Sequence, residues 1–206
     1  MRAVLVALIV CVAGSARADR ATARATVEEG ELHAKAGDKD GALARFEKAM
    51  SDDPDLLAAY DAAIPLWLEG KRWTEAATFL ERATARHADY AAGWYALGFV
   101  YRQEQRWDRA VAAYEESTGL QPGDAAPWYG LAASYEGAGR AGDAVRAYRA
   151  YRVRERDPAK AQFRADARAA IARLLGPPAD WRDAVLRLAL DGGDRAAFAL
   201  AAKLAR

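Results

Sequence analysis

The chain is poor in the residues from which most reactive sites are built. Its 206 residues include one cysteine, Cys11, and two histidines, His33 and His87, neither of which has an acidic cluster near it at metal-ligand spacing. The sequence also lacks a phosphate-binding glycine loop and a nucleophile elbow. We therefore expect no enzyme activity, no cofactor and no metal site.

A strong charge of either sign is missing as well. The sequence has 30 Lys and Arg against 29 Asp and Glu, which gives a formal net charge of +1. Such a balance of charges does not indicate nucleic acid or an anionic membrane as the partner. With 52% hydrophobic and 29% charged residues, the composition is that of a soluble folded protein.

No hydrophobic run is long enough for a stable membrane span. The longest, from Ala3 to Ala13, is well short of the roughly 20 residues that a spanning helix needs. Arg2 precedes it and the small-x-small tripeptide ending at Ala18 follows, an order typical of a secretory signal. We expect residues 1–18 to be a signal peptide cleaved after Ala18, and the mature chain to be periplasmic or secreted. An uncleaved segment that tethers the chain to a membrane is the alternative.

Cys11 lies inside this same apolar run. Lipid attachment to it is disfavoured, because Val10 stands where a lipoprotein signal needs a small residue. Cleavage after Ala18 leaves a mature chain without cysteine, which excludes disulfides, thiol catalysis and thiolate metal ligands. Its stability must then come from packing.

What the sequence does contain is a repeating pattern of signature residues. Its clearest copy spans residues 91–124 and has signature residues at Trp94, Leu97, Gly98, Tyr101, Ala110, Tyr114 and Pro122. Trp94, Leu97 and Tyr101 share one face of a helix, and Ala110 and Tyr114 form the facing stripe of a second helix. A helix pair of this kind cannot bury its apolar side alone, so successive pairs must stack.

These residues resemble the tetratricopeptide repeat, a family of antiparallel helix pairs with a period of about 34 residues. The same register gives four repeats without gaps, at about 23–56, 57–90, 91–124 and 125–158, within a region of residues 19–158. The resemblance implies an all-α, right-handed α-solenoid of antiparallel helix pairs with a C-terminal helical extension. Replacing Trp94 or Trp128 by Ala is expected to cost about 3 to 5 kcal/mol if these rings are buried in the stack.

The register ends after Pro158. Residues 159–175 carry an apolar stripe of Phe163, Ala167, Ala170, Ile171, Leu174 and Leu175, which predicts a capping helix. Residues 176–206 follow as a degenerate helical hairpin, with a turn expected at Asp191 to Asp194. This hairpin either extends the stack or forms a separate docking module.

Helix breakers and caps fall near the expected boundaries. Gly37, Gly70 and Gly139 are expected between the paired helices, and Thr74 and Asp108 are candidate N-caps. Pro65 conflicts with this scheme, because it falls inside a predicted helix and should kink or restart it.

In the resembling family, the first helix of each repeat lines a concave surface, and its fifth, ninth and twelfth positions most often touch a bound peptide. The resemblance therefore implies a partner-binding groove, to which the first repeat contributes Val27 and Glu31. The groove residues expected to matter most are Asp61, Leu68, Tyr95, Phe99, Arg102, Tyr129 and Glu136. The aromatic members either grip an apolar or helical segment of a partner or only complete the packing between repeats.

One subclass of the family binds acidic tails through a clamp of two Lys, two Asn and one Arg. The corresponding positions here are Val27, Glu31, Ala62, Ala92 and Ala96, so this groove should not take an acidic C-terminal tail. A candidate anionic-surface patch lies elsewhere, on the second helix of repeat four. It consists of Arg146, Arg149, Arg152 and Arg156.

The sequence thus predicts a non-enzymatic scaffold or adaptor that binds a protein or peptide partner, with envelope complex assembly as the expected setting. No nucleic acid partner is expected, and membrane association is expected only if the signal stays uncleaved. A membrane-tethered adaptor is one alternative and an accessory subunit of an enzyme complex is another. The partner's identity and the oligomeric state are not encoded in any motif.

Overall fold

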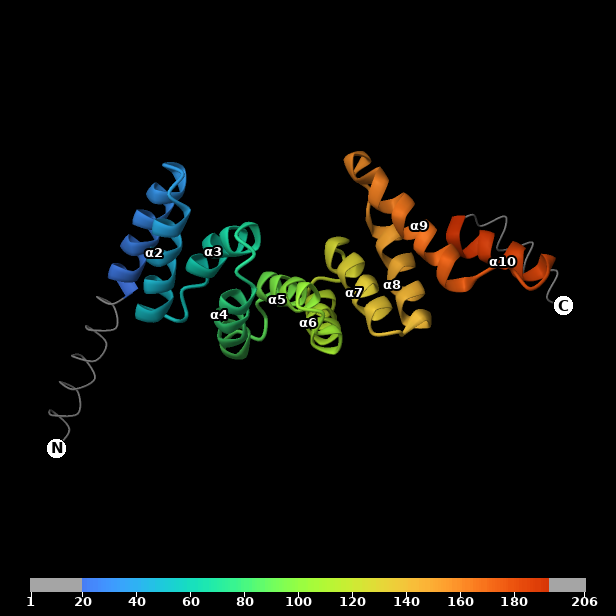
Figure 1. Ribbon diagram of the computed structural model, residues 1–206, viewed down its shortest axis with the longest axis horizontal. Coiled ribbons are helices and arrows are strands. Elements are labelled where there is room, and N and C mark those ends of the chain that lie inside the picture. Colours follow the sequence, from blue (N-terminus) through green and yellow to red (C-terminus); the bar gives the residue numbers. More distant parts are fainter. Residues whose placement is uncertain (1–19, 193–206) are drawn as a thin grey trace, which may run out of the picture. The chain divides into compact units, whose positions relative to one another are not determined.

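The computed structural model describes residues 20–192, and every regular element in that range is helical. The predicted signal at residues 1–18 and the chain after Gly192 lie outside the described residues. Backbone contacts divide the chain into two compact units, Met1–Glu104 and Gln105–Arg206. Within each unit, consecutive helices are joined by short turns and pack side by side, as Figure 1 shows.

The described part of the first unit begins with a helix over residues 20–35. It is followed by α2 (Lys39–Asp52), α3 (Leu57–Glu69), α4 (Trp73–Arg86) and α5 (Ala91–Gln103). Helix α3 packs against α2, α4 and α5, so it lies at the centre of the unit. The large buried side chains of this unit are Phe46, Met50, Tyr60, Trp67 and Leu80.

The second unit contains α6 (Trp107–Leu120), α7 (Ala126–Gly137), α8 (Ala141–Arg154), a 3₁₀ turn (Pro158–Lys160), α9 (Ala161–Leu175) and α10 (Trp181–Gly192). Helices α6 to α9 pack in chain order, each against the next. Helix α10 extends through Asp191, so the start of the turn expected at Asp191 to Asp194 is still helical. The rest of the predicted hairpin lies outside the described residues.

One residue with left-handed backbone occurs at the same position of each of the four repeats. These residues are Gly37 (φ 83°), Lys71 (φ 54°), Gln105 (φ 58°) and Gly139 (φ 73°). Gly70 lies between the paired helices α3 and α4, as predicted, where it caps α3 with φ −74°, and the left-handed residue is the next one, Lys71. Two of the four positions are therefore not glycine, and a side chain in this backbone region costs about 1–2 kcal/mol.

The structure corrects two further local predictions. Helix α3 continues across Pro65 without a restart, because buried Ala63 and Trp67 hold it on both sides of the lost backbone bond. Thr74 and Asp108 are not N-caps. They lie in the first turns of α4 and α6, whose N-cap residues are arginines that make no side-chain cap bond.

The aromatic side chain at the fourth position of a repeat bonds back to the turn before its own helix. Tyr60 Oη donates to the carbonyl of Pro54 at 3.3 Å, and the indole Nε1 of Trp94 donates to the carbonyl of Ala88 at 3.0 Å. Trp128 Nε1 bonds to the carbonyl of Pro122 at 3.2 Å in the same way. Each signature ring therefore fixes the turn that joins its repeat to the one before.

A second hydrogen bond joins successive repeats directly and recurs with the repeat register. The eleventh-position aromatic donates to a glutamate of the preceding repeat, 20 residues earlier in the chain. The three pairs are Trp67 Nε1 to Glu47 at 3.3 Å, Tyr101 Oη to Glu81 at 2.5 Å, and Tyr135 Oη to Glu115. We call these three bonds the aromatic–glutamate bonds.

Helix α9 presents a different buried face from that of the repeats. Its buried residues are Ala167, Ala170 and Ile171, as the apolar stripe predicts. Phe163, predicted to belong to the same stripe, is 51% exposed. Beyond α9, Arg187 Nη1 donates to the carbonyl of Gly176 at 2.7 Å, and this bond holds α10 to the C-terminal end of α9.

Candidate functional site

The predicted groove residues of the first unit lie on two helices, α3 and α5. Asp61 is exposed, and the side chains of Leu68, Tyr95, Phe99 and Arg102 are half-buried. Val27, by contrast, is only 7% exposed, so the first repeat cannot offer it to a ligand. That position was carried over from the resembling family, and here it belongs to the core.

Within this unit, Phe99 and Arg102 lie together beside a residue that the sequence reasoning did not select. The Arg102 guanidinium carbon is 5.2 Å from the centre of the Phe99 ring, and Trp73 of α4 meets the same ring edge-on at 6.1 Å. The Nε of Arg102 is buried and finds no hydrogen-bond acceptor among the described residues. An aromatic surface with an unused buried donor beside it suits an apolar side chain and a carbonyl group of a bound segment.

Asp61 is engaged within the fold. Its Oδ1 accepts a 2.5 Å hydrogen bond from the hydroxyl of Tyr90, the N-cap residue of α5. Burial, and then this bond to the carboxylate, raise the pKa of Tyr90. Asp61 thus ties α3 to the start of α5, which gives it a structural role whether or not it also contacts a ligand.

Tyr129 is the centre of an aromatic cluster in the second unit. Its ring lies edge-on to three others, Tyr148 and Tyr151 of α8 and Phe163 of α9, with centroid distances of 5.7, 5.1 and 5.8 Å. Tyr148 and Tyr151 are buried, Tyr129 is half-buried and Phe163 is half exposed. We call these four residues the aromatic cluster; Phe163 is its most accessible member.

Sequence reasoning missed Phe163 as a surface residue, although a signal was present. Tyr95, Tyr129 and Phe163 are each one repeat period apart, so Phe163 occupies the fifth position of a further first helix. The prediction ended the register at Pro158 because the other signature residues stop there. The fifth position alone continues into α9.

Glu136, the other predicted groove residue of this unit, pairs with α9. Its Oε1 accepts a 2.8 Å bond from Arg173 Nη2, and the carboxylate beside it raises the pKa of Arg173. The second oxygen of Glu136 is buried and has no hydrogen-bond partner among the described residues. This carboxylate therefore helps to hold α9 and keeps one acceptor unused.

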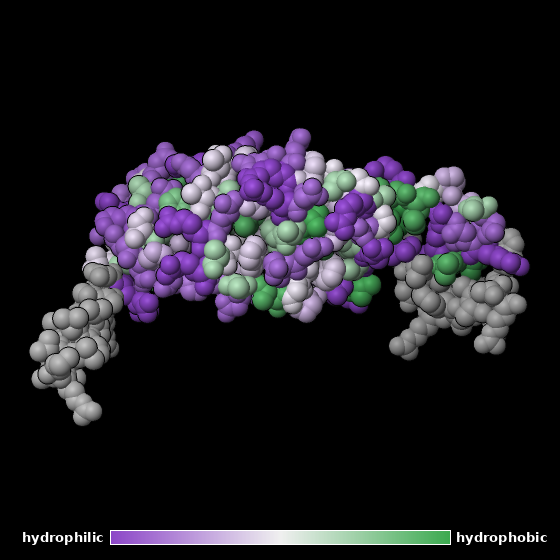
Figure 2. Space-filling model, turned by 90° about the horizontal axis from the view of Figure 1, so that it is seen from below, coloured by the Kyte–Doolittle hydropathy of each residue, from purple (hydrophilic) through white to green (hydrophobic). Residues whose placement is uncertain are grey.

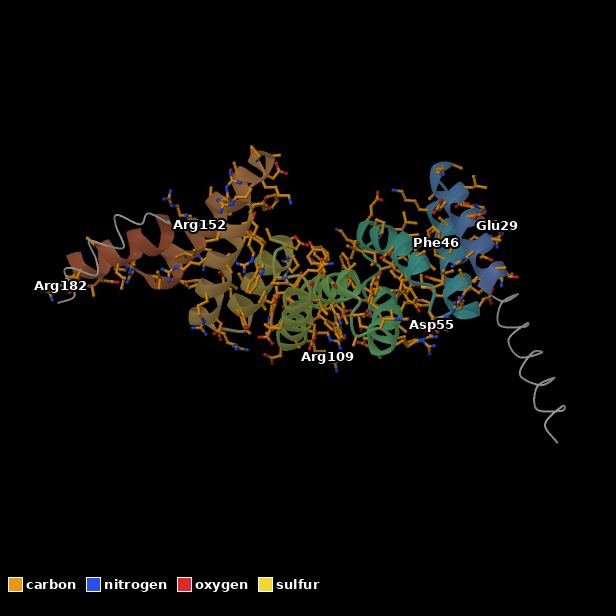
Figure 3. The ribbon with its side chains drawn as sticks, turned by 180° about the vertical axis from the view of Figure 1, so that it is seen from behind. Glu29, Phe46, Asp55, Arg109, Arg152 and Arg182 are labelled. Carbon is orange, nitrogen blue, oxygen red and sulfur yellow. The ribbon has the colours of Figure 1, made fainter. Side chains whose placement is uncertain are left out.

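The four arginines of the predicted anionic-surface patch do not form one surface of free charges. Arg146 pairs with Asp143, Arg149 and Arg152 are half-buried, and Arg156 is exposed. Of these four, Arg152 lines a groove between α8 and α9. Figure 3 shows Arg152 at the place where α8 runs beside α9.

Neither a cluster of metal ligands nor a membrane-spanning helix occurs among the described residues. No group of three or more His, Cys, Asp or Glu within residues 20–192 is arranged to hold a metal ion. None of the helices in the described range is long and apolar enough to cross a membrane. On the face seen in Figure 2, hydrophilic side chains predominate and hydrophobic ones lie between them.

Comparison with known families finds one match in sequence. Residues 91–134 match the family model described as tetratricopeptide repeat. This segment contains the predicted third repeat and most of the first helix of the fourth. No curated protein sequence matches the chain.

Solved structures of similar fold are more numerous. YrrB, whose structure is described as a TPR protein with an unusual peptide-binding site, has a TM-score of 0.63 at 17% identity, over 86% of this chain and 90% of that one. A MamA protein structure has a TM-score of 0.59 at 25% identity, over 71% and 79% of the two chains. The first TPR of Spaghetti (RPAP3), bound to an HSP90 peptide, has a TM-score of 0.52 at 20% identity, over 57% and 93%. These matches agree with the predicted all-α solenoid of antiparallel helix pairs.

Proposed function

Since this chain is a tetratricopeptide repeat protein, we propose that it is a non-enzymatic scaffold that binds a peptide or helical segment of a partner protein. The aromatic cluster of the second unit carries this proposal. Phe163 leaves half of its surface in water although its ring lies edge-on to Tyr129, whose ring also contacts Tyr148 and Tyr151. A rigid ring held in place by other rings loses little entropy when a partner covers it, and aromatic residues of this kind dominate binding surfaces.

The first unit supports the same function with a second aromatic surface. Phe99 is half-buried between Trp73 and Arg102, and the buried Nε of Arg102 lacks an acceptor within the described chain. An unpaired buried donor costs free energy unless a ligand supplies the acceptor. A backbone carbonyl of a bound segment would satisfy it.

The proposed ligand is apolar or amphipathic and not an acidic C-terminal tail. The fold keeps Ala62, Ala92 and Ala96 where the clamp of the tail-binding subclass has long polar side chains. The apolar rings of Phe163 and Phe99 favour hydrophobic anchor residues. Two of the similar structures, YrrB and the Spaghetti repeat, are described with a peptide-binding site or a bound peptide, which supports a peptide partner here.

The test measures capture of peptides from a random peptide library by wild type and by Phe163→Ala. Because Phe163 is half exposed, its removal should leave the fold nearly intact, which circular dichroism checks. The matched control is Leu32→Ala, which removes an even more exposed hydrophobic side chain from the other unit. We expect selected peptides to lose at least about tenfold in affinity for Phe163→Ala and to bind Leu32→Ala normally. Equal binding to all three proteins would refute the docking role of the aromatic cluster.

The structure changes the design of a broader test. A triple alanine variant of Tyr95, Phe99 and Tyr129 is the obvious choice from the sequence. Tyr129 contacts three rings, however, so its truncation disturbs packing as well as binding. Phe99→Ala alone is the cleaner probe of the first unit, with Phe163→Ala as its counterpart in the second.

Export and envelope assembly remain part of the proposal. Export rests on Arg2, the apolar run from Ala3 to Ala13 and the small residues before Asp19, and envelope assembly rests on the resemblance to the tetratricopeptide repeat family. Sequencing the N-terminus of the mature protein tests them, with Asp19 as the expected first residue. An N-terminus at Met1 together with membrane sedimentation would favour the tethered adaptor instead.

A further inference from the structure

The groove between α8 and α9 differs in chemistry from the aromatic surfaces. It has a volume of about 590 Å³ and is lined by Arg152 from α8 and, from α9, by Arg164, Ala165, Arg168, Ala169 and Ala172. Three arginines and three alanines therefore line the groove. The short alanine side chains keep the groove open and let the backbone of another chain come close.

The groove lies on the opposite side of α9 from Phe163. Phe163, Ala167 and Ala170 lie along one side of this helix, and the latter two are buried. Ala165, Ala169 and Ala172 are two residues further along, about 200° around the helix, and all three are exposed. The groove is therefore separate from the aromatic cluster, and a ligand in it would not compete for Phe163.

The carboxylates near the groove have other partners. Asp166 accepts a 2.8 Å bond from Gln162 Nε2, and Glu155 is buried and accepts from the backbone N–H of Asp157 at 2.9 Å. Arg164 donates to the backbone carbonyl of Asp157 at 2.7 Å. Because a carbonyl group is neutral, this contact does not neutralise the charge of Arg164. The hydrogen bonds to Asp166 and Glu155 come from neutral donors and do not offset the carboxylates, so the positive character of the region comes from its excess of Arg and Lys over Asp and Glu.

The charge of this region is also unusual for the chain. Residues 141–173 contain nine Arg and Lys but only four Asp and Glu, whereas the whole chain is nearly balanced at +1. Arginine prevails over lysine there, and its planar guanidinium binds carboxylates through two parallel hydrogen bonds. A local excess of positive charge attracts an anionic partner to this region, although the chain as a whole is nearly neutral.

We infer that the α8–α9 groove binds an acidic segment of a partner protein, with Glu or Asp side chains paired to Arg164 and Arg168. A protein segment fits better than an anionic membrane because the arginines line a recess. A chain can enter a recess, whereas a flat headgroup surface meets projecting side chains. The carboxylate clamp that this chain lacks would lie on other helices, among them α3 and α5. Its absence therefore does not argue against an acidic ligand in the α8–α9 groove.

The experiment measures binding of a fluorescent peptide of alternating Glu and Ala, acetylated and amidated so that no terminal carboxylate is present. Fluorescence anisotropy compares wild type with Arg164→Gln/Arg168→Gln. The control is Arg146→Gln/Arg156→Gln, which removes the same charge from exposed positions outside the groove lining. We expect at least about a tenfold loss of affinity for the groove variant, little change for the control, and weaker wild-type binding as salt rises.

Three outcomes would overturn the inference. Equal losses in both double variants would mean that the peptide responds only to net charge. No binding by wild type would exclude the acidic segment, and wild-type binding to vesicles of anionic phospholipid but not to the peptide would point to a membrane instead. Phe163→Ala should bind the acidic peptide as wild type does. The peptide measurement therefore tests the groove separately from the proposed docking role of the aromatic cluster.

A charge reversal provides a positive test of the same groove. Arg164→Glu/Arg168→Glu should lose the Glu and Ala peptide and gain affinity for a peptide of alternating Lys and Ala. Arg168 is exposed and Arg164 is only half-buried, so the variant should stay folded, and thermal melting followed by circular dichroism verifies it. A reversed protein that binds neither peptide while remaining folded would contradict direct pairing.

Discussion

The joints between repeats and the joint between α8 and α9 are built from different contacts. At each of the three repeat joints, an aromatic side chain donates to a glutamate 20 residues earlier in the chain. One step further along the register, the two positions hold Ala169 and Arg149. Helix α9 therefore cannot make a fourth aromatic–glutamate bond.

A second position shows the same change. The sixth position of the repeat is Ala62, Ala96 and Gly130 in successive repeats, and the next in the series is Arg164. At Gly130, a Cβ atom would lie 2.3 Å from Tyr114 Cζ, so the repeat joint there admits only the smallest residue. In α9 the same position lines the open groove.

This difference explains why binding surfaces occur near α9. The repeat joints are closed by buried rings and the glutamates to which they donate. Helix α9 is held instead by Arg173 with Glu136 of α7, by Lys160 with Glu155 at the end of α8, and by the half-exposed Phe163 against Tyr129 of α7. This arrangement therefore leaves an aromatic ring on one side of α9 and arginines on the other.

The largest effect should follow from removing the buried aromatic of the first joint. Trp67 is 0% exposed, stacks on Phe79 at 5.5 Å and donates to Glu47. Trp67→Ala should cost about 3–5 kcal/mol in urea or thermal unfolding. The sequence assigned this cost to Trp94 and Trp128, but both rings are half-buried, so Trp128→Ala should cost less than half as much. Equal costs would contradict the distinction.

The second-largest loss of stability is expected where Gly130 lies close to Tyr114, at the joint between the third and fourth repeats. A methyl group at Gly130 would collide with Tyr114, which is 1% exposed and has no room to move. Gly130→Ala should therefore destabilise the protein by about 1–3 kcal/mol. Gly119 is the matched control, since no atom lies within 4 Å of its added Cβ in helix α6. Gly119→Ala should stabilise by about 0.5–1 kcal/mol, and destabilisation of both would point to an effect other than packing.

The turns inside the repeats offer a smaller effect of opposite sign. Lys71 has the left-handed backbone that Gly37 and Gly139 adopt at the equivalent positions. Lys71→Gly should stabilise by up to about 1 kcal/mol, because the strain of its Cβ outweighs the added freedom of the unfolded chain. Gly139→Ala should cost a similar amount. Chemical unfolding measures both, and a loss of stability in Lys71→Gly would show that its side chain matters more than its backbone.

The fold could be predicted from the sequence because its signal is periodic. The positions of Trp94, Tyr101 and Tyr114 recur from repeat to repeat, and periodicity specifies both the helices and the faces that they bury. The glutamates at 47, 81 and 115 recur with the same spacing, so the aromatic–glutamate bonds were also encoded. They were missed because exposed glutamates carry no hydrophobic signal.

The candidate site could be predicted only in part, because it depends on contacts outside the repeat. The predicted groove residues are at the surface, yet Asp61 bonds to Tyr90 and Glu136 bonds to Arg173. Both partners come from other helices, at distances along the chain that no motif fixes. The groove lined by Arg164 and Arg168 arises where periodicity ends, so the repeat register could not indicate it.

The smallest predicted effect concerns pH and the third aromatic–glutamate bond. Burial, followed by the bond to Glu115, raises the pKa of Tyr135 to about 12, whereas an unfolded tyrosine titrates near pH 10. The folded state thus keeps its proton longer than the unfolded state. The stability that Tyr135 contributes is fully present below pH 10 and is lost as the pH rises to about 12. Tyr135→Phe has no proton to lose there, so its unfolding free energy should fall less than that of wild type between pH 9 and 12.

Burial also raises the pKa of Tyr151, in the aromatic cluster beside α9, to about 12. Tyr151→Phe is therefore the matched variant at the α8–α9 joint. Urea unfolding across this pH range, with tyrosinate absorbance as the titration signal, compares the two. If the fold depends more on the repeat joints than on the attachment of α9, Tyr135→Phe should change global unfolding and Tyr151→Phe should mainly change the tyrosinate titration. Identical pH profiles for wild type and Tyr135→Phe would show that Tyr135 does not control alkaline unfolding.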